Sequence, residues 1–300
     1  MTTITHPEKV LFPGDGITKG GLAEYYEAIA PAMLPHIRNR PVTMERYPAG
    51  IDKQGFWQKD VSRGFPSWLE RVEVPKKGGV VHHALITDLR SLLWVVNQNT
   101  ITPHVWTSRV PHLDRPDICV FDLDPPDAGS PDMLRAAAVA LRDLLEQLGL
   151  PSWVKTTGSK GLHLAIPLDG SADKGTAARF AHSVGRLIVS RYPGELTLEF
   201  HKKDRGGRIL VDTGRNDYTA TFAAAYAVRA RHGAPVSAPC TWEEVTTAAI
   251  RPDSLTIRDV PGRVERLGDL WADMRRRRYS LTRPIEKLRR LMDAAEASAE

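Results

Sequence analysis

Cysteines and long apolar runs are scarce in this sequence, and both absences narrow the class of protein. The 300 residues include two cysteines, Cys119 and Cys240, too few for a disulfide framework and without metal-ligand spacing. Both are expected to be reduced and buried, as in a cytosolic protein. No apolar run reaches the length of a membrane-spanning helix, and residues 1–10 contain no apolar leader. We therefore predict a cytoplasmic protein with no membrane partner.

The overall composition is ordinary for a globular protein and only mildly basic. Apolar residues make up 42% and charged residues 26% of the chain, and the net charge is +5. This length is enough for one large domain or two small ones. The basic excess is compatible with a polyanionic partner but does not require one.

The most informative stretch is residues 118–125, an apolar β-prone run that ends in two carboxylates. Alternate residues of a strand share a face, so Asp122 and Asp124 would project together, with roughly 6–7 Å between their Cα atoms. Paired carboxylates repel each other unless a cation lies between them, and such oxygen ligands suit Mg²⁺ or Mn²⁺. The alternative is a solvated strand end that happens to be acidic, and this pattern alone leaves both readings open.

Two further strand-turn-strand segments follow. The turn at residues 158–161 joins strands at 152–157 and 162–167, and its backbone amides, Ser159 and Lys160 could cradle a phosphate. His163 would point away from the apolar face of its strand. Residues 196–201 and 208–212 are predicted to form a hairpin around the turn at 203–207, which places a third carboxylate, Asp212, at a strand end.

The helices are marked by their capping residues. Thr18, Ser130 and Thr241 are typical helix N-caps, and Gly149 is a typical C-terminal stop. From about Val264 the chain is predicted to be helical. The run at 275–278, four consecutive arginines, is interpreted as a solvated helix face, with nucleic-acid contact the less favoured alternative.

Aromatic and basic residues near the N-terminus allow a nucleic-acid interface without requiring it. Phe56 and Trp57 are adjacent, so on a strand they point to opposite faces and one should lie outside the core. Beside Lys59, an exposed ring could stack on a base while the ammonium meets a phosphate. From spacing alone, Lys9 and Lys19 are more simply surface lysines, and His104 could be either a core residue or a phosphate donor.

Taken together, several motifs resemble the polymerase domain of bacterial ligase D, a member of the archaeo-eukaryotic primase superfamily that acts in non-homologous end joining. The resemblance runs from the opening at residues 7–13 to about Glu244. The motifs are Pro103-His104-Val105, Phe121-Asp122-Leu123-Asp124-Pro125, Thr157-Gly158-Ser159-Lys160-Gly161-Leu162-His163-Leu164, Val211-Asp212, Tyr226-Ala227-Val228-Arg229-Ala230-Arg231 and Gly233-Ala234-Pro235-Val236.

The resemblance implies an α/β (α+β) primase-type fold, in which a central, mostly antiparallel sheet is flanked by helices and an N-terminal module. We expect one primase-polymerase domain, with the module at 1–110, the catalytic sheet at 111–245 and C-terminal helices at 246–300. The motifs imply two divalent ions, Mn²⁺ or Mg²⁺, held by Asp122, Asp124 and Asp212. They imply nucleotide binding by His104, Ser159, Lys160, His163, Arg205 and Arg229, and DNA binding by Lys9, Lys19, Phe56, Trp57 and Lys59.

The implied function is template-dependent extension of primers at DNA ends and gaps, with a preference for ribonucleotides. The expected partners are DNA, nucleoside triphosphates, Ku and a separate ligase, and the chain is expected to be a nucleoid-associated monomer. It looks like a stand-alone polymerase domain, since it has no ligase or nuclease module. Glu45 departs from the family, because a lysine that binds a 5′-phosphate stands there in relatives. A metal-dependent nuclease and a non-catalytic DNA-end scaffold are the alternatives.

Overall fold

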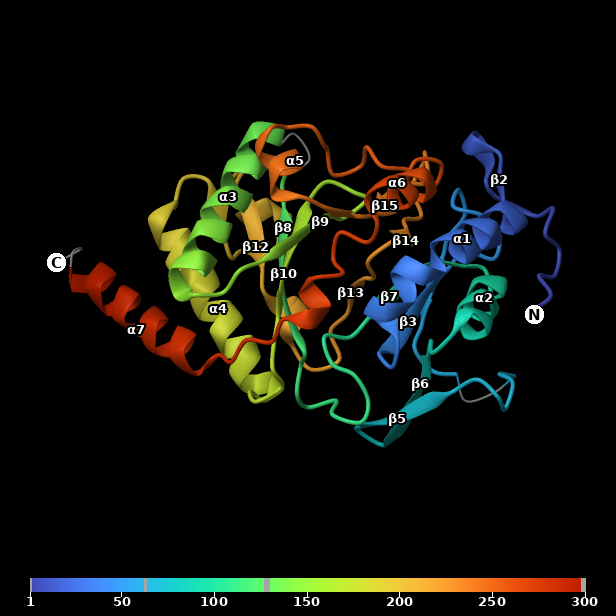
Figure 1. Cartoon of the computed structure of the whole chain (residues 1–300), viewed down its shortest axis with the longest axis horizontal. Coiled ribbons are helices and arrows are strands. Elements are labelled where there is room, and N and C mark those ends of the chain that lie inside the picture. The colour runs from blue at the N-terminus through green and yellow to red at the C-terminus, as the bar shows by residue number, and fades with distance from the viewer. Residues whose placement is uncertain (1, 62–63, 127–129, 298–300) are drawn as a thin grey trace.

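The computed structural model of the chain describes residues 2–61, 64–126 and 130–297, and two six-stranded sheets organise them (Figure 1). The first sheet is built around the acidic strand β8. All neighbouring strands in this sheet are antiparallel, except that β11 and β12 run parallel to each other. The prediction of a mostly antiparallel central sheet is therefore confirmed. In spatial order its strands are β11 (Leu196–Thr197), β12 (Ile209–Asp212), β8 (Ile118–Asp124), β10 (Leu162–Pro167), β9 (Trp153–Thr156) and β16 (Pro239–Cys240).

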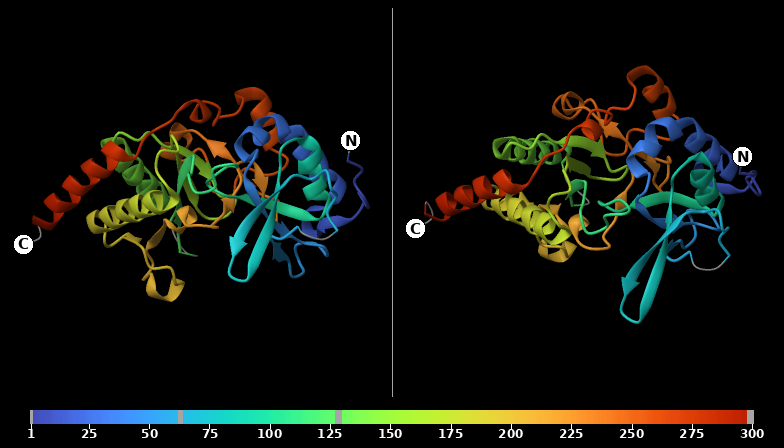
Figure 2. Two further views of the ribbon diagram at one scale, coloured as in Figure 1. Left: turned by 90° about the horizontal axis from the view of Figure 1, so that it is seen from below. Right: turned by 60° about the horizontal axis from the view of Figure 1, so that its bottom comes forward.

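The second sheet is formed mainly by the N-terminal third of the chain. Its order is β13 (Phe222–Ala223), β7 (Thr100–Val105), β3 (Pro41–Arg46), β6 (Gly79–Leu85) and β5 (Arg71–Lys76), and β4 (Phe56–Gln58) also pairs with β3. The hairpin of β5 and β6 projects from the body of the molecule (Figure 2). Two small ribbons complete the strands, β1 (Val10–Phe12) with β2 (Ile17–Thr18), and β14 (Ala227–Val228) with β15 (Val236–Ser237).

Strand β13 connects the two halves of the chain. It lies within the range 111–245 that was expected to form the catalytic sheet, yet it pairs with β7 of the second sheet. The main apolar core of the second sheet accordingly contains Phe222, Tyr226 and Val236 beside residues of α1 and β3. The division of the chain at residue 110 stays a prediction.

The helices begin where their capping residues predict. Thr18 Oγ1 accepts a hydrogen bond from the Gly21 amide, Thr241 forms a capping box with Glu244, and Gly149 ends its helix in the left-handed conformation. The helices are α1 (Lys19–Ile37), α2 (Leu89–Asn97), α3 (Pro131–Leu148), α4 (Lys174–Arg191), α5 (Trp242–Thr246), α6 (Val260–Leu267) and α7 (Thr282–Ala297), with 3-10 turns at Pro13–Asp15, Lys202–Asp204, Gly214–Asn216 and Met274–Arg276.

The first sheet is buried on both faces, and this decides where its polar residues point. Helices α3 and α4 cover one face (Figure 1). On this face, Phe121 and Leu123 of β8 pack into an apolar core with residues of the two helices. Ile118 and Val120 point the other way, into the core shared with the second sheet. Asp122 and Asp124 follow the alternation of Ile118 and Val120, so they lie on the face that looks toward the second sheet.

Two local predictions are wrong. Residues 196–212 do not form a hairpin, because β11 and β12 run parallel and β12 lies between β11 and β8. Parallel neighbours cannot be joined by a tight turn, so residues 198–208 form an excursion instead of two paired strands. The run Arg275–Arg278 does not lie on a helix face; it spans a 3-10 turn and the segment that leads to α7.

Cys119 and Cys240 are free and buried, as predicted. None of the helices in the described part of the chain is both long and apolar enough to cross a bilayer. Residues 298–300, which end the predicted C-terminal helical region, lie outside the described residues.

Gly161 is expected to be indispensable for joining β10 to β8. A Cβ at this position would lie 2.0 Å from the carbonyl oxygen of Leu123. That oxygen belongs to the backbone of β8, so the clash cannot be relieved by a side-chain rotation. Gly161→Ala should therefore lower the free energy of unfolding by roughly 1–3 kcal/mol or more in urea denaturation. The control is Gly194→Ala, where an added Cβ meets no atom within 4 Å. Equal stability of the two variants would contradict this close approach.

Candidate active site

Strand register places four polar side chains in one row across the first sheet. Lys155 of β9 is paired with His163 of β10, His163 with Asp122 of β8, and Asp122 with Asp212 of β12. Residues directly opposite each other on neighbouring strands project from the same face. All four therefore look into the space between the two sheets. The predicted convergence of Asp122, Asp212 and His163 is present in the structure.

The two opposed carboxylates are held together by Arg215. Its Nη2 lies 3.2 Å from Asp122 Oδ2 and 3.1 Å from Asp212 Oδ2. Like charges directly opposite on a sheet are destabilising, and one guanidinium between them offsets that repulsion. Asn216 fixes the turn that carries Arg215, since its side chain accepts from the amide of Val120 at 2.8 Å and donates to that residue's carbonyl at 2.7 Å.

The surroundings shift the pKa values of the two carboxyl groups in opposite directions. Burial raises the pKa of Asp122, but His163, Arg215 and Lys155 together outweigh burial, and the pKa lies well below its ordinary value. Burial and the neighbouring Asp122 raise the pKa of Asp212, and Arg215 only partly opposes this. This splitting is what a like-charge pair produces when one member has more cationic partners.

His163 is neutral at pH 7 because burial and the nearby Lys155 lower its pKa to about 4. Its Nε2 lies 3.4 Å from Asp122 Oδ2. Its Nδ1 is buried and has no hydrogen-bond partner among the described residues. Lys155 is fully buried and lies next to Ser237, with its Nζ in hydrogen-bond contact with the hydroxyl.

Asp124 is the most accessible of the three aspartates, with 39% of its side chain exposed, and it pairs with Arg205. The Arg205 Nη1 donates to Asp124 Oδ2 at 2.8 Å, and the same guanidinium donates to the carbonyls of Glu199 and Phe200. Arg205 thereby fastens the excursion between β11 and β12 to the end of β8. In this structure its charge is directed at a carboxylate.

The three carboxylates have the chemistry that divalent cations prefer, and two of them, Asp122 and Asp212, converge on one point. Within the described residues, no group of three or more His, Cys, Asp or Glu side chains is arranged to hold a metal ion. Instead Arg215 is a stand-in cation, and its contacts show that Asp122 and Asp212 converge on one positive group. Hard oxygen donors around such a position suit Mg²⁺ or Mn²⁺.

A cleft of about 190 Å³ collects most of the predicted nucleotide residues beside these carboxylates. Its basic and polar groups come from both sheets and from the turn before β10. Its lining includes His104, Asp122, Asp124, Ser159, Lys160, His163, Arg215 and Arg229. The structure thus brings together residues that lie more than a hundred positions apart in the sequence.

The turn at residues 158–161 is organised by Thr157. Thr157 Oγ1 accepts from the amides of Ser159 at 3.2 Å and Gly161 at 3.1 Å. These two amides are therefore not open to a ligand, which corrects the prediction that they cradle a phosphate. Gly158 has φ +62°, and a Cβ there would lie 2.6 Å from Arg229 Cγ, so glycine lets Arg229 pack against the turn.

His104 and Glu45 form a buried pair on the second-sheet side of the cleft. His104 Nε2 lies 3.3 Å from Glu45 Oε2, and Tyr47 donates its hydroxyl to Glu45 at 3.1 Å. Burial lowers the pKa of His104 to about 4 despite the carboxylate. The exposed Trp57 ring lies 4.6 Å from that of His104. Glu45 thus lies beside the nucleotide residues, and its predicted effect on a 5′-phosphate stays a prediction.

The two N-terminal lysines form a separate basic group with Arg46. The backbone amide of Lys19 donates to the carbonyl of Lys9 at 2.7 Å. Burial, then Lys9 and Arg46, lower the pKa of Lys19. The Arg46 Cζ atom lies 5.1 Å from the centroid of the Phe56 ring, and both Phe56 and Trp57 are exposed. Lys59, the residue directly after β4, is also exposed.

Sequence reasoning missed Arg215, Asn216, Lys155 and Thr157. Arg215 and Asn216 follow Asp212 closely, and a cation with an amide just after an acidic strand end could have drawn notice. Lys155 carries no local signal, since only the pairing of β9 with β10 places it beside His163.

Comparison with known proteins identifies relatives over nearly the whole chain. The model of the LigD primase-polymerase domain family matches residues 18–271. The multifunctional non-homologous end joining protein LigD of Mycolicibacterium smegmatis is 34% identical over 90% of this chain. The protein of the same name from Pseudomonas aeruginosa is 33% identical over 90% of the chain. The chain spans about a third of the length of these curated relatives, 36% and 32%.

A solved structure shares the fold. The polymerase domain from Mycobacterium tuberculosis ligase D in complex with DNA superposes with a TM-score of 0.87 at 33% identity, covering 93% of this chain and 99% of that one. The primase-type fold predicted from the motifs is thereby confirmed.

Arg215 is expected to stabilise the metal-free protein by neutralising the carboxylate pair. Arg215→Gln should lower the melting temperature in chelator-treated buffer at pH 7.5, since Asp122 and Asp212 then face each other as anions. The loss should be smaller at pH 4.5, because the raised pKa of Asp212 favours its protonation on acidification, which removes the repulsion. Thermal unfolding followed by circular dichroism measures both values. Arg186→Gln, on the exposed side of α4, is the matched control. A loss that is equal at both pH values would contradict the charge argument.

Proposed function

The chain belongs to the LigD primase-polymerase family, and from that premise we propose that it extends DNA primers by template-dependent nucleotidyl transfer at ends and gaps. The observation that carries the proposal is the cleft itself. It sets Asp122 and Asp124 against Ser159, Lys160, His163 and Arg229, with Asp212 paired beside Asp122. A set of carboxylates facing a set of cations is what a metal-bound triphosphate requires.

In the proposed reaction, the 3′-oxygen of the primer attacks the α-phosphorus of the nucleotide. The bond to the pyrophosphate group breaks as the new phosphodiester forms. Divalent ions held by Asp122, Asp124 and Asp212 would stabilise charge on the attacking and leaving oxygens. Lys160 and Arg229 offer cationic donors for the triphosphate, where charge accumulates on the leaving group. Neutral His163 and the Ser159 hydroxyl orient the nucleotide without adding charge.

Substrate binding is proposed to extend from the cleft onto the second sheet. Trp57 lies exposed above His104 and offers a face for a template base. Lys9, Lys19 and Arg46 form a basic group suited to a terminal phosphate of the downstream strand. Phe56 and Lys59 flank this surface. A preference for ribonucleotides and Mn²⁺, and an association with Ku or a separate ligase, follow from the family resemblance and belong to the same proposal.

The proposal predicts that Asp122→Asn abolishes primer extension. The expected loss is about 100-fold or more, because the carboxylate that Arg215 and His163 share would no longer bind a cation. The assay follows a labelled primer on gapped DNA with ribonucleotides or deoxyribonucleotides, in Mn²⁺ or Mg²⁺. Asp143→Asn, on the exposed face of α3, is the control and should extend normally.

Two outcomes would contradict the proposal. Shortening of the primer without extension by the wild-type protein would identify a nuclease. Extension by Asp122→Asn at the control rate would remove the carboxylates from the chemistry and leave a scaffold role for this acidic row.

A further inference from the structure

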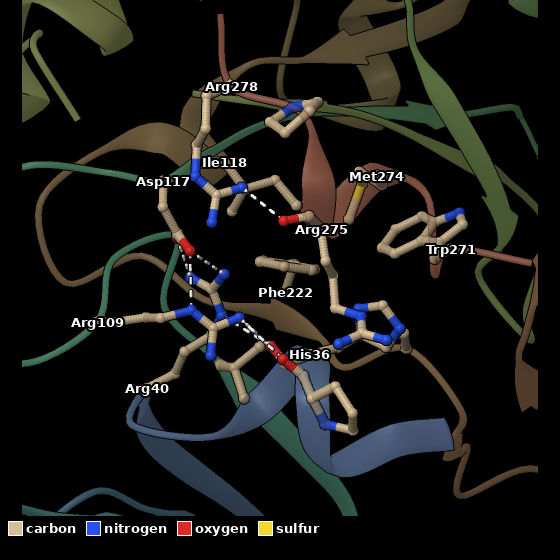
Figure 3. A pocket seen from close by; sticks show the side chains of 14 residues that line it. His36, Arg40, Arg109, Asp117, Ile118, Phe222, Trp271, Met274, Arg275 and Arg278 are labelled. Atoms are coloured by element: carbon tan, nitrogen blue, oxygen red, sulfur yellow. Dashed lines mark hydrogen bonds and ion pairs between the residues drawn. The ribbon is translucent and has the colours of Figure 1, made fainter. Parts of the chain in front are cut away.

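A second cavity lies between the two sheets, at the opposite end of the acidic strand from the cleft. It has a volume of about 240 Å³ and touches Ile118, where β8 begins, whereas the cleft touches Asp122 and Asp124, where β8 ends. Phe222 of β13 lines both spaces and separates them. Figure 3 shows Phe222 in the middle of this cavity, with basic side chains on either side.

The walls of this cavity carry an excess of positive charge. Four guanidinium groups, of Arg40, Arg109, Arg275 and Arg278, line it with one carboxylate, that of Asp117. The crowding shows in the pKa of Arg40, which burial lowers to about 10, with Arg109 and Arg278 acting in the same direction against Asp117. The floor is apolar and includes Phe222, Trp271 and Met274.

Two of these arginines have a structural role. Arg40 Nη1 lies 2.6 Å from Asp117 Oδ1, and Arg109 Nε lies 2.8 Å from Asp117 Oδ2. Both also donate to backbone carbonyls, Arg40 to those of His36 and Trp106, and Arg109 to those of Pro35 and His36. These contacts fasten the end of α1 to the start of β8 and consume the carboxylate of Asp117.

The other two arginines are only weakly engaged. Arg275 lies 3.8 Å from Asp269, whose carboxylate already accepts from His36 and Tyr226 at 2.8 Å each. Arg278 donates to the carbonyls of Arg275 and Arg277 and forms no ion pair with any described residue. Arg275 lies within the 3-10 turn Met274–Arg276 and Arg278 lies just after it, and both side chains line the cavity with weaker ion pairing than Arg40 and Arg109 have (Figure 3).

We propose that this cavity is a second binding site, for a small anion of the phosphate class held by Arg275 and Arg278. Guanidinium groups match phosphate oxygens with charge-assisted hydrogen bonds, and these two enter the cavity from different sides of Phe222 (Figure 3). The excess of cations suits an anion with more than one charge. The volume lies below the range of about 300–1,000 Å³ that is usual for pockets of drug-sized ligands, so the occupant is small. It is either free pyrophosphate or the phosphate group of a mononucleotide, and both share this chemistry.

The test compares two double variants by calorimetric titration of sodium pyrophosphate into metal-free protein. Arg275→Gln/Arg278→Gln removes the cavity pair. Arg276→Gln/Arg277→Gln removes the same charge from the same segment without touching the cavity lining. Neither pair lines the cleft, so any binding of pyrophosphate there is common to both proteins. The cavity-pair variant should lose one binding event or weaken it about 10-fold or more relative to the control pair. Equal isotherms would overturn the proposal.

A second measurement locates the ligand without any arginine variant. Met274 lines the cavity, and the chain has six methionines. Methyl spectra of methionine-labelled wild-type protein, with the Met274 signal assigned from Met274→Leu, should show that signal shifting during the pyrophosphate titration. Arg278→Gln alone should reduce the shift, and its exposed side chain makes the variant safe for folding. A Met274 signal that does not respond to pyrophosphate or to adenosine monophosphate would contradict the site.

The two ligand sources give different patterns. A Met274 response to both pyrophosphate and adenosine monophosphate assigns the site to a phosphate group carried by a nucleotide or free. A response to pyrophosphate alone assigns it to the free diphosphate. The site needs neither metal nor DNA for these measurements, so its failure would leave the proposed polymerase activity untouched, and failure of the polymerase assay would leave this site untouched.

Discussion

The candidate active site depends on one electrostatic constraint, the placement of Asp122 directly opposite Asp212 in a row of the first sheet. Two carboxylates in cross-strand register repel each other, and the repulsion grows as water is excluded. Arg215 lies between them and offsets the repulsion, and the neutral imidazole of His163 on the next strand contacts Asp122. The site is therefore prepared for a cation, and a protein side chain occupies that role here.

The second sheet supplies what the first sheet lacks. One face of the first sheet packs against α3 and α4, and the other faces the second sheet. The acidic row lies on the face toward the second sheet, so its side chains point into the interior. His104 and Glu45 come from the second sheet, and β13 completes the wall of the cleft with Phe222 and Ala223. The same packing leaves the arginine-lined cavity at the other end of the interface. Two separate spaces thus arise from one contact between sheets.

Features set by short-range sequence could be predicted, and features set by pairing could not. The alternation of Asp122 and Asp124, the caps at Thr18, Ser130 and Thr241, and the turn before His163 all follow from local geometry. The role of Lys155 depends on which strands become neighbours, and nothing near it encodes that; Arg215 follows Asp212 closely, but its contact with Asp122 depends on the pairing of β12 with β8. The wrong hairpin at 196–212 has the same cause, since β12 pairs with the distant β8 on one side and runs parallel to β11 on the other. Glu45 was noticed as a departure from the family, but only the pairing of β3 with β7 places it beside His104.

We infer that the Asp122–Asp212 pair requires a cation and that Arg215 competes with a divalent ion for these two carboxylates. Equilibrium binding of Mn²⁺, followed by the electron paramagnetic resonance signal of the free ion, tests this directly with no DNA or nucleotide present. Our account predicts that Arg215→Gln binds Mn²⁺ more tightly than the wild type, because the competing guanidinium is gone, and that Asp212→Asn binds it more weakly. Unchanged or weaker binding by Arg215→Gln, together with unchanged binding by Asp212→Asn, would contradict it.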